Sequence, residues 1–319
     1  MLKKVIFIIV IVLVLSILGY GIYISYHQKE DTDISNNYSN INVYDYYDEE
    51  ETIRQEETFD SNDIYLWNKD NIPTTTNYTQ NNGNYFDDPN FVPYMTRYDV
   101  PDGVKIKGAV LINPGGAFMF RSEGNEGTQV AEQLTKLGYV SFVVHYRVRP
   151  YTMQEGALDL ARAVRYVRKN ASKYGIEEDD IAIIGFSAGG ILCGEEILNF
   201  DGLTNGTKLD SSYKPDELDN ISADVKAVGF IYSFYGRLSV ASKDVELFRK
   251  SDLPPAFYAY GTKDPFYEEM NASVKALEEA NTSVESHVLQ NTGHGFGPGT
   301  SNSVWINDFD KWLSNIFEN

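Results

Sequence analysis

The chain has 319 residues and a formal net charge of −19 at pH 7. This excess of acidic side chains argues against binding to nucleic-acid phosphates and against an electrostatic hold on anionic lipid. A single cysteine, Cys193, excludes an internal disulfide framework, and the four histidines form no cluster with metal-ligand spacing. We therefore expect no metal and no cofactor.

The N-terminus carries a long apolar segment. Lys3 and Lys4 precede a run from Val5 to about Ile24, and about 20 residues of helix cross a bilayer core. A cleaved signal peptide, which would release a secreted protein, is the alternative, but its apolar region is only about 7–15 residues long. Residues 1–26 are predicted to be an uncleaved transmembrane anchor with a cytoplasmic N-terminus, which places the remaining chain outside the cell.

Residues 27–84 differ in composition from the segments on either side. They are rich in Asn, Asp, Glu, Thr and Tyr and lack long apolar periodicity. Such a composition cannot bury enough surface to fold alone, so we predict an acidic, mostly disordered stalk. Tyr65, Leu66 and Trp67 are its candidates for packing back onto a domain. The globular domain is predicted to span residues 85–319.

Within the predicted domain, short apolar strand patterns alternate with helical patterns. This alternation predicts an α/β fold with a mostly parallel, doubly wound sheet and helices on both faces. In such sheets the chemistry gathers at the carboxyl ends of the strands. The strands are predicted at 94–100, 106–112, 139–146, 181–184, 225–232, 255–260 and 284–289, and the helices at 127–137, 153–174, from the turn at 187 to about 200, at 268–280 and at the end of the chain.

A glycine-flanked serine, Ser187, lies between the predicted strand 181–184 and the helix after it. Side chains two residues before and after so sharp a turn would collide, which accounts for Gly185 and Gly189. The turn places the Ser187 hydroxyl at a helix N-terminus, where unpaired N–H groups favour negative charge. In this strand–turn–helix context the pattern G-x-S-x-G is that of a nucleophile elbow. A Gly/Ser-rich loop is the alternative.

A serine nucleophile needs a base. His294 lies in the glycine-rich loop G-H-G-F-G just after a predicted strand, and it is the predicted base; a surface loop histidine is the alternative. His145 and His287 lie inside predicted strands, where structural histidines are expected. His27 lies beside the apolar N-terminal segment.

The base in turn needs an orienting carboxylate between the serine and the histidine in chain order. Asp264 follows the predicted strand 255–260 and precedes Pro265. Taken alone it could be an ordinary turn aspartate. Its position in the order Ser, Asp, His makes Asp264 the predicted partner of the base, with Glu268 and Asp252 as substitutes.

Acyl transfer also needs N–H donors for the developing oxyanion. One donor is predicted to be the backbone N–H of Ala188, the residue after the nucleophile. The other is expected in the loop Asn113–Phe118 after the strand 106–112, where paired glycines let backbone N–H groups face a ligand. A purely structural Pro-Gly-Gly turn is the alternative.

These motifs, together with the segment Tyr-Arg-Val-Arg-Pro at 146–150, resemble those of α/β-hydrolase esterases. The most similar branch is the acetyl-esterase and acetyl-xylan-esterase-like group related to hormone-sensitive lipase, and the resemblance covers about residues 94–317. Pro114 stands where the family's His-Gly-Gly-Gly loop has histidine, and His145 stands where a related segment has aspartate. The resemblance implies a triad of Ser187, Asp264 and His294, and an oxyanion hole of Gly116, Ala117 and Ala188.

We therefore expect a serine esterase that hydrolyses short-chain, especially acetyl, esters through an acyl-enzyme. Only the segments 201–223 and 237–253 could form flaps, so we expect an open site that acts on small-molecule esters or extracellular carbohydrate. Membrane contact is expected through the N-terminal helix only, and no nucleic-acid partner is expected. The alternatives are a peptidase, thioesterase or lipid esterase of the same fold, and a non-catalytic cell-surface binding module.

Overall fold

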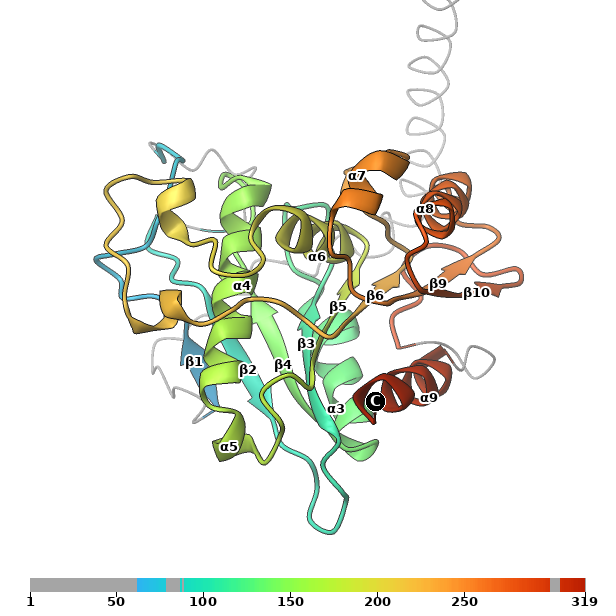
Figure 1. Ribbon diagram of the computed structural model, residues 1–319, viewed down its shortest axis with the longest axis horizontal. Coiled ribbons are helices and arrows are strands. Elements are labelled where there is room, and N and C mark those ends of the chain that lie inside the picture. The colour runs from blue at the N-terminus through green and yellow to red at the C-terminus, as the bar shows by residue number, and fades with distance from the viewer. Residues whose placement is uncertain (1–61, 79–86, 88, 299–304, 319) are drawn as a thin grey trace, which may run out of the picture. The chain divides into compact units, whose positions relative to one another are not determined.

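The structure is a computed structural model that describes residues 62–78, 87, 89–298 and 305–318 (Figure 1). The predicted transmembrane anchor, residues 1–26, lies outside these ranges, as do residues 27–61 of the predicted stalk. None of the helices within these ranges has the length and apolar character that crossing a bilayer requires.

The described strands form one sheet in the order β1-β2-β4-β3-β5-β6-β9-β10, and a separate hairpin. From β4 to β10 in this order the neighbours are parallel, whereas β1 and β2 join the edge antiparallel. The mostly parallel sheet predicted from the alternating patterns is confirmed. The strands are β1 (Asp63–Tyr65), β2 (Tyr94–Tyr98), β3 (Gly108–Asn113), β4 (Tyr139–His145), β5 (Ile181–Phe186), β6 (Ala227–Ile231), β9 (Ala256–Gly261) and β10 (Val284–Leu289).

The central strands are buried along their whole length because helices cover both faces of the sheet. Every residue of β3, β4, β5 and β6 is buried, which explains why these strands read as continuous apolar runs rather than alternating ones. The register pairs Asn113, at the end of β3, with Gly185 near the end of β5. The Pro-Gly-Gly loop and the serine turn therefore leave the sheet side by side.

The helices lie in two layers (Figure 1). On one face α3 packs beside α9, and on the other α4 packs along α6, with α8 over β9 and β10. The predicted helix 153–174 is divided at Asn170 into α4 and α5. The helices are η1 (Glu123–Thr128), α3 (Gln129–Lys136), α4 (Met153–Lys169), α5 (Ala171–Tyr174), α6 (Ala188–Asn199), η2 (Gly206–Lys208), η3 (Glu217–Asn220), α7 (Val245–Lys250), α8 (Tyr267–Glu279) and α9 (Trp305–Phe317), and the hairpin is β7 (Gly236–Arg237) with β8 (Val240–Ala241).

The stalk predicted over residues 27–84 needs a correction, because residues 62–78 pack onto the domain. Strand β1 extends the sheet at the β2 edge. Leu66 and Trp67 are buried, and the indole N–H of Trp67 donates to Asp159 of α4 over 2.7 Å. The predicted domain start at residue 85 is therefore too late: this polar stretch is held by contacts distant in sequence.

The buried carboxylate of Glu155, in the first turn of α4, holds residues 74–76 to the domain through hydrogen bonds. Its oxygens accept hydrogen bonds from the hydroxyl groups of Thr74 and Thr76 and from the backbone N–H groups of Thr75 and Thr76. The backbone N–H of Thr152 adds a further bond at the N-terminus of α4. Burial alone raises the pKa of Glu155, but these hydrogen bonds outweigh it and lower the pKa to about 2.

The depressed pKa of Glu155 predicts acid lability. Its stabilisation is complete above the unfolded-state value near 4.5 and is lost as the pH falls from there through about 2. We expect Glu155→Gln to lower the free energy of unfolding at pH 7 by about 3 kcal/mol and to flatten the acid limb. Denaturant unfolding of the full-length chain between pH 7 and pH 2 measures both effects. The exposed Glu177→Gln is the control, and equal stability of the two variants at pH 7 would refute this role.

Candidate active site

Ser187 occupies the sharp turn between β5 and α6, with φ 49° and ψ −119°. A Cβ on Gly185 would lie 2.4 Å from the carbonyl carbon of Gly189, and a Cβ on Gly189 would lie 2.0 Å from the carbonyl oxygen of Asn113. Both glycines are therefore required by close backbone contacts, as the sequence predicted. The strained serine is held by its own backbone, since its N–H donates to Ile231 and its carbonyl accepts from the Ser233 hydroxyl.

Ser187, His294 and Asp264 form one continuous hydrogen-bonded relay. The hydroxyl Oγ of Ser187 lies 2.8 Å from Nε2 of His294, and Nδ1 of His294 lies 2.8 Å from Oδ2 of Asp264. A carboxylate only accepts hydrogen bonds, so Nδ1 carries the proton and Nε2 is free to accept from the serine hydroxyl. The side chain of Asp264 is fully buried and also accepts from the N–H of Phe266. The three groups predicted to meet thus form a chain in which His294 is within hydrogen-bond reach of both Ser187 and Asp264.

The loops after β9 and β10 hold the aspartate and the histidine together. The N–H of Lys263 donates to the Thr292 carbonyl, and the N–H of Asn291 donates to the Thr262 hydroxyl. A Cβ on Gly261 would lie 2.0 Å from the carbonyl oxygen of Thr292. The close approach of the two loops fixes the relay at the carboxyl ends of these adjacent parallel strands.

The Pro-Gly-Gly loop after β3 turns its backbone in an uncommon way. Gly116, Ala117 and Phe118 have φ values of 129°, 55° and 57°. A Cβ on Gly115 would lie 2.9 Å from the Cβ of Ser187, so this loop touches the nucleophile turn. Among the hydrogen bonds between described residues, none is donated by the N–H groups predicted as oxyanion donors, those of Gly116, Ala117 and Ala188. These groups are therefore available to an acceptor.

Glu126, which the sequence analysis did not single out, connects the two halves of the site. This buried carboxylate accepts from the Gly115 N–H over 2.6 Å and from the Tyr232 hydroxyl over 2.7 Å. The Tyr232 hydroxyl accepts from the N–H of Gly297, and its ring centroid lies 4.9 Å from that of His294. Burial raises the pKa of Glu126. One carboxylate thus links the Pro-Gly-Gly loop to the loop that carries the histidine.

The other described histidines have structural contacts, as predicted for strand positions. His145 lies between Glu123 and Thr96 and stacks on Tyr94. His287 bonds Glu285. Neither is within hydrogen-bond reach of Ser187 in the described part of the chain.

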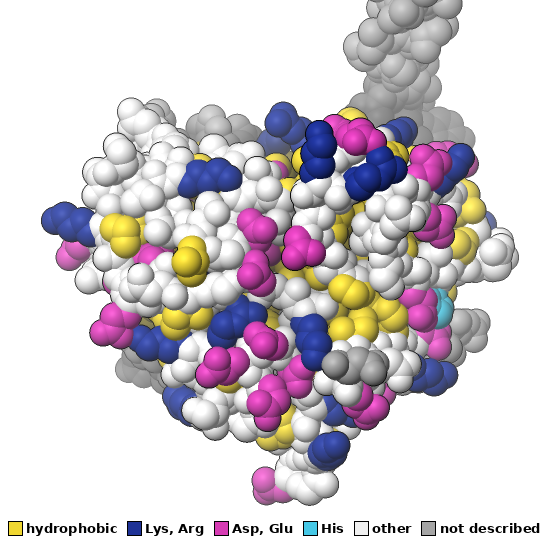
Figure 2. All heavy atoms as spheres, in the orientation of Figure 1, with side chains coloured by type: hydrophobic (Ala, Val, Ile, Leu, Met, Phe, Trp, Pro, Cys, Tyr) yellow, Lys and Arg dark blue, Asp and Glu magenta, His cyan; other side chains and the backbone are white. Residues whose placement is uncertain are grey.

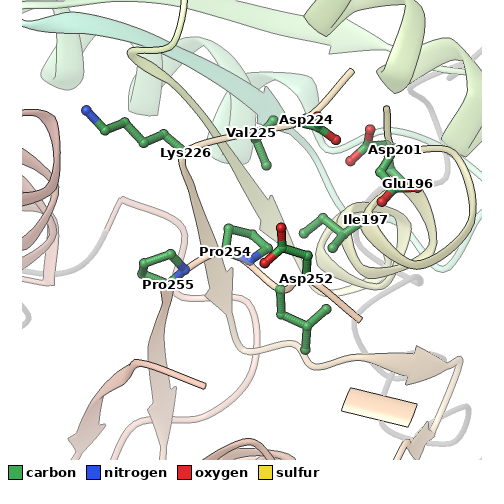
Figure 3. Close-up of a pocket in the computed structure, with 10 residues that line it drawn as sticks. Glu196, Ile197, Asp201, Asp224, Val225, Lys226, Asp252, Pro254 and Pro255 are labelled. Carbon is green, nitrogen blue, oxygen red and sulfur yellow. The ribbon is translucent and has the colours of Figure 1, made fainter. Parts of the chain in front are cut away.

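The carboxylate substitutes considered from the sequence are not used. The hydrogen bond from His294 goes to Asp264, and neither Glu268 nor Asp252 forms one with it. Asp252 instead lines a hollow of about 360 Å³ together with Pro254, Val225 and the buried Glu196 (Figure 3). This hollow lies where the chain enters β6 and β9, at the end of the strands opposite to the relay.

Comparison with known proteins finds relatives named as a xylanase and as an acetylxylan esterase. The BD-FAE family model matches residues 100–247, a stretch that contains Ser187 but ends before Asp264 and His294. Endo-1,4-beta-xylanase B of Butyrivibrio fibrisolvens is 34% identical over 146 residues, which cover 44% of this chain and 22% of that protein. The acetylxylan esterase of Xylanibacter ruminicola is 37% identical over 92 residues, 29% of this chain and 18% of that protein. This chain spans about a fifth of the length of either curated relative.

The fold is also that of solved structures. The crystal structure of an acetyl ester-xyloside bifunctional hydrolase from Caldicellulosiruptor lactoaceticus aligns with a TM-score of 0.60 at 24% identity. The alignment covers 80% of this chain and 95% of that chain. The similarity to α/β-hydrolase esterases that the motifs indicated is confirmed.

Proposed function

We propose that this chain, an α/β-hydrolase, is a carboxylic ester hydrolase that uses Ser187 as its nucleophile. The observation that carries the proposal is the unbroken relay from the Ser187 hydroxyl through His294 to Asp264, with both hydrogen bonds at 2.8 Å. The N–H groups of Ala188, next to the serine in the chain, and of Gly116 and Ala117, in the loop that touches the serine turn, donate no hydrogen bond to another described residue. A base, an orienting carboxylate and oxyanion donors are the components of acyl transfer to serine.

The proposed reaction has two halves. In the first, Ser187 Oγ bonds to the ester carbonyl carbon while its proton moves to Nε2 of His294, and the negative charge on the carbonyl oxygen meets the N–H groups of Ala188 and Ala117. When the ester C–O bond breaks, the proton moves from Nε2 to the departing alcohol. In the second half a water molecule gives its proton to Nε2, attacks the acyl carbon and releases the acid, and the proton returns to Ser187.

We propose short acyl groups, in particular acetyl on carbohydrate, as the substrates. The relatives named as a xylanase and an acetylxylan esterase support a carbohydrate ester. The architecture supports a short acyl group, since segment 201–223 packs on α4 through Arg165, which donates to the carbonyls of Gly202 and Ile221. Both ends of that segment are therefore held on α4, which limits its ability to close over Ser187.

The apolar segment from Val5 to Ile24 supports a second part of the proposal, attachment to a membrane with the hydrolase outside the cell. Extracellular or cell-wall polysaccharide would then be in reach of the site. Alkaline carbonate extraction of membranes from producing cells tests this part. We expect the chain to stay in the membrane pellet, and quantitative release into the supernatant would contradict it.

The esterase proposal predicts a chain-length profile. On 4-nitrophenyl esters, kcat/KM should be greatest for acetyl and fall by about tenfold or more toward octanoyl, because no long acyl channel is expected. The full-length chain should also release acetate from acetylated xylan. A kcat/KM that rises steadily with acyl length would favour the lipid-esterase alternative.

Ser187→Ala supplies the control for these assays. The variant should lose at least about 1,000-fold in kcat, since the nucleophile is gone while the N–H donors remain. Retained hydrolysis would remove Ser187 from the mechanism. A carbohydrate-binding module would bind its polysaccharide equally well with either residue and hydrolyse nothing, which separates that alternative.

Glu126 is expected to act as a positioning residue. An amide at this position has one oxygen acceptor where the carboxylate uses two, so Glu126→Gln should lower kcat by about tenfold and Glu126→Ala by about 100-fold, with little change in KM. Steady-state kinetics on 4-nitrophenyl acetate measure the two constants separately. Glu132→Gln, on the exposed face of α3, is the matched control. An unchanged kcat in both Glu126 variants would show that the link contributes only to folding.

A further inference from the structure

A hollow of about 530 Å³, here called the side pocket, lies beside the Pro-Gly-Gly loop. Its walls come from three separate parts of the chain: that loop, the turn that leads into α4, and the β7–β8 hairpin. Most of its lining is apolar or aromatic, but it includes two basic groups. The lining residues used below are Phe118, Tyr151, Met153, Leu238, Arg149 and Arg237.

The side pocket is joined directly to the proposed oxyanion hole. Phe118 follows Ala117 in the chain, and its carbonyl accepts a hydrogen bond of 2.8 Å from the N–H of Arg149. The wall of the pocket and the proposed N–H donors therefore belong to one short loop. A substrate whose ester carbonyl meets these donors can place a neighbouring part in the side pocket.

The guanidinium groups of Arg149 and Arg237 are exposed, and they lack the partners that the other described arginines have. Each of the other described arginines bonds a carboxylate or a carbonyl, as Arg121 bonds Asp87 and Arg165 bonds Thr204. Within the described ranges, the side chains of Arg149 and Arg237 form neither a hydrogen bond nor an ion pair. Glu195 is close enough for the charge of Arg237 to lower its pKa against the stronger effect of burial, but the two form no ion pair.

Two arginines without bound partners among the described residues contrast with the acidic character of the rest of this protein. The whole chain carries a net charge of −19, and acidic and basic side chains are interspersed on the face that Figure 2 shows. The general field therefore repels anions. Two guanidinium groups without partners among the described residues, in the pocket that Phe118 of the Pro-Gly-Gly loop lines, provide a local exception. Guanidinium groups bind carboxylates through paired, charge-assisted hydrogen bonds.

We propose that the side pocket binds a carboxylate group of the ester substrate, so that the preferred substrate is an anionic ester. Arg149 and Arg237 hold the carboxylate, while Phe118 and Leu238 contact the sugar or aryl ring that bears it. A uronate sugar next to an acetylated one has this chemistry and keeps the acyl group short. The inference rests on the proposed esterase function and specifies its substrate class.

Two matched pairs of esters test the inference and identify the side of the ester that carries the carboxylate. On the alcohol side, 4-acetoxybenzoate is compared with the neutral 4-acetoxybenzamide. On the acyl side, the mono-4-nitrophenyl ester of glutaric acid is compared with 4-nitrophenyl pentanoate. For the alcohol-side pair we expect the full-length chain to give a kcat/KM at least about tenfold greater for the anionic member, and added salt to reduce that ratio. A preference in the acyl-side pair alone would contradict the short acyl group proposed above.

Substitution at the two arginines locates the effect. Arg149→Gln and Arg237→Gln should each reduce the ratio of anionic to neutral kcat/KM by about tenfold, because each removes one charge-assisted contact. Lys311→Gln removes the same unit charge from the exposed surface of α9 and should leave the ratio unchanged. A ratio near one in the native chain, or an equal fall in all three variants, overturns the side-pocket inference.

The failure of this inference is distinguishable from failure of the esterase proposal. If the neutral esters are hydrolysed in a Ser187-dependent manner without any preference for the anionic members, the esterase proposal stands and the side-pocket inference falls. If no ester of either pair is hydrolysed, both are overturned.

Discussion

The close backbone approach between the end of β3 and the beginning of α6 is the constraint on which the site depends. Glycine is needed at 189 because the Asn113 carbonyl occupies the space of a side chain, and at 115 because Ser187 lies within 2.9 Å of where a Cβ would be. The same register therefore sets the strained serine turn and the loop of proposed N–H donors. Neither can shift without the other, so the geometry of the site follows from the packing of two buried parallel strands.

The rest of the site is attached to this rigid pair by polar contacts. The loops after β9 and β10 bring Asp264 and His294 to the serine, and Glu126 joins the histidine side to the Pro-Gly-Gly loop through Tyr232. Moving a carboxylate such as that of Glu126 out of water costs free energy. Hydrogen bonds from donors to both of its oxygens offset that cost. The side pocket differs, since its two arginines are exposed and have no hydrogen-bond or ion-pair partner among the described residues.

Much of this arrangement could be predicted from the sequence, because the predicted features are local. Apolar runs mark the central strands, and the chain order of Ser187, Asp264 and His294 fixes which strand ends bring them together. Features that depend on distant contacts could be predicted only in part. Leu66 and Trp67 are candidates for packing onto a domain, and both are buried, but the polar residues around them look like a stalk until Glu155 and α4 are in place. Glu126 likewise has no local signature in a segment of small and acidic residues, and the availability of an arginine is visible only when every other partner is known.

The central claim is that the relay transfers an acyl group to Ser187. Acid quenching of the full-length chain during turnover of 4-nitrophenyl acetate, followed by peptide mass spectrometry, tests it most directly. The account predicts an acetyl group on the peptide that contains Ser187, and none there in the His294→Ala variant, which lacks the base. Steady product formation with Ser187 unmodified, or with the acetyl group on another side chain, would contradict it.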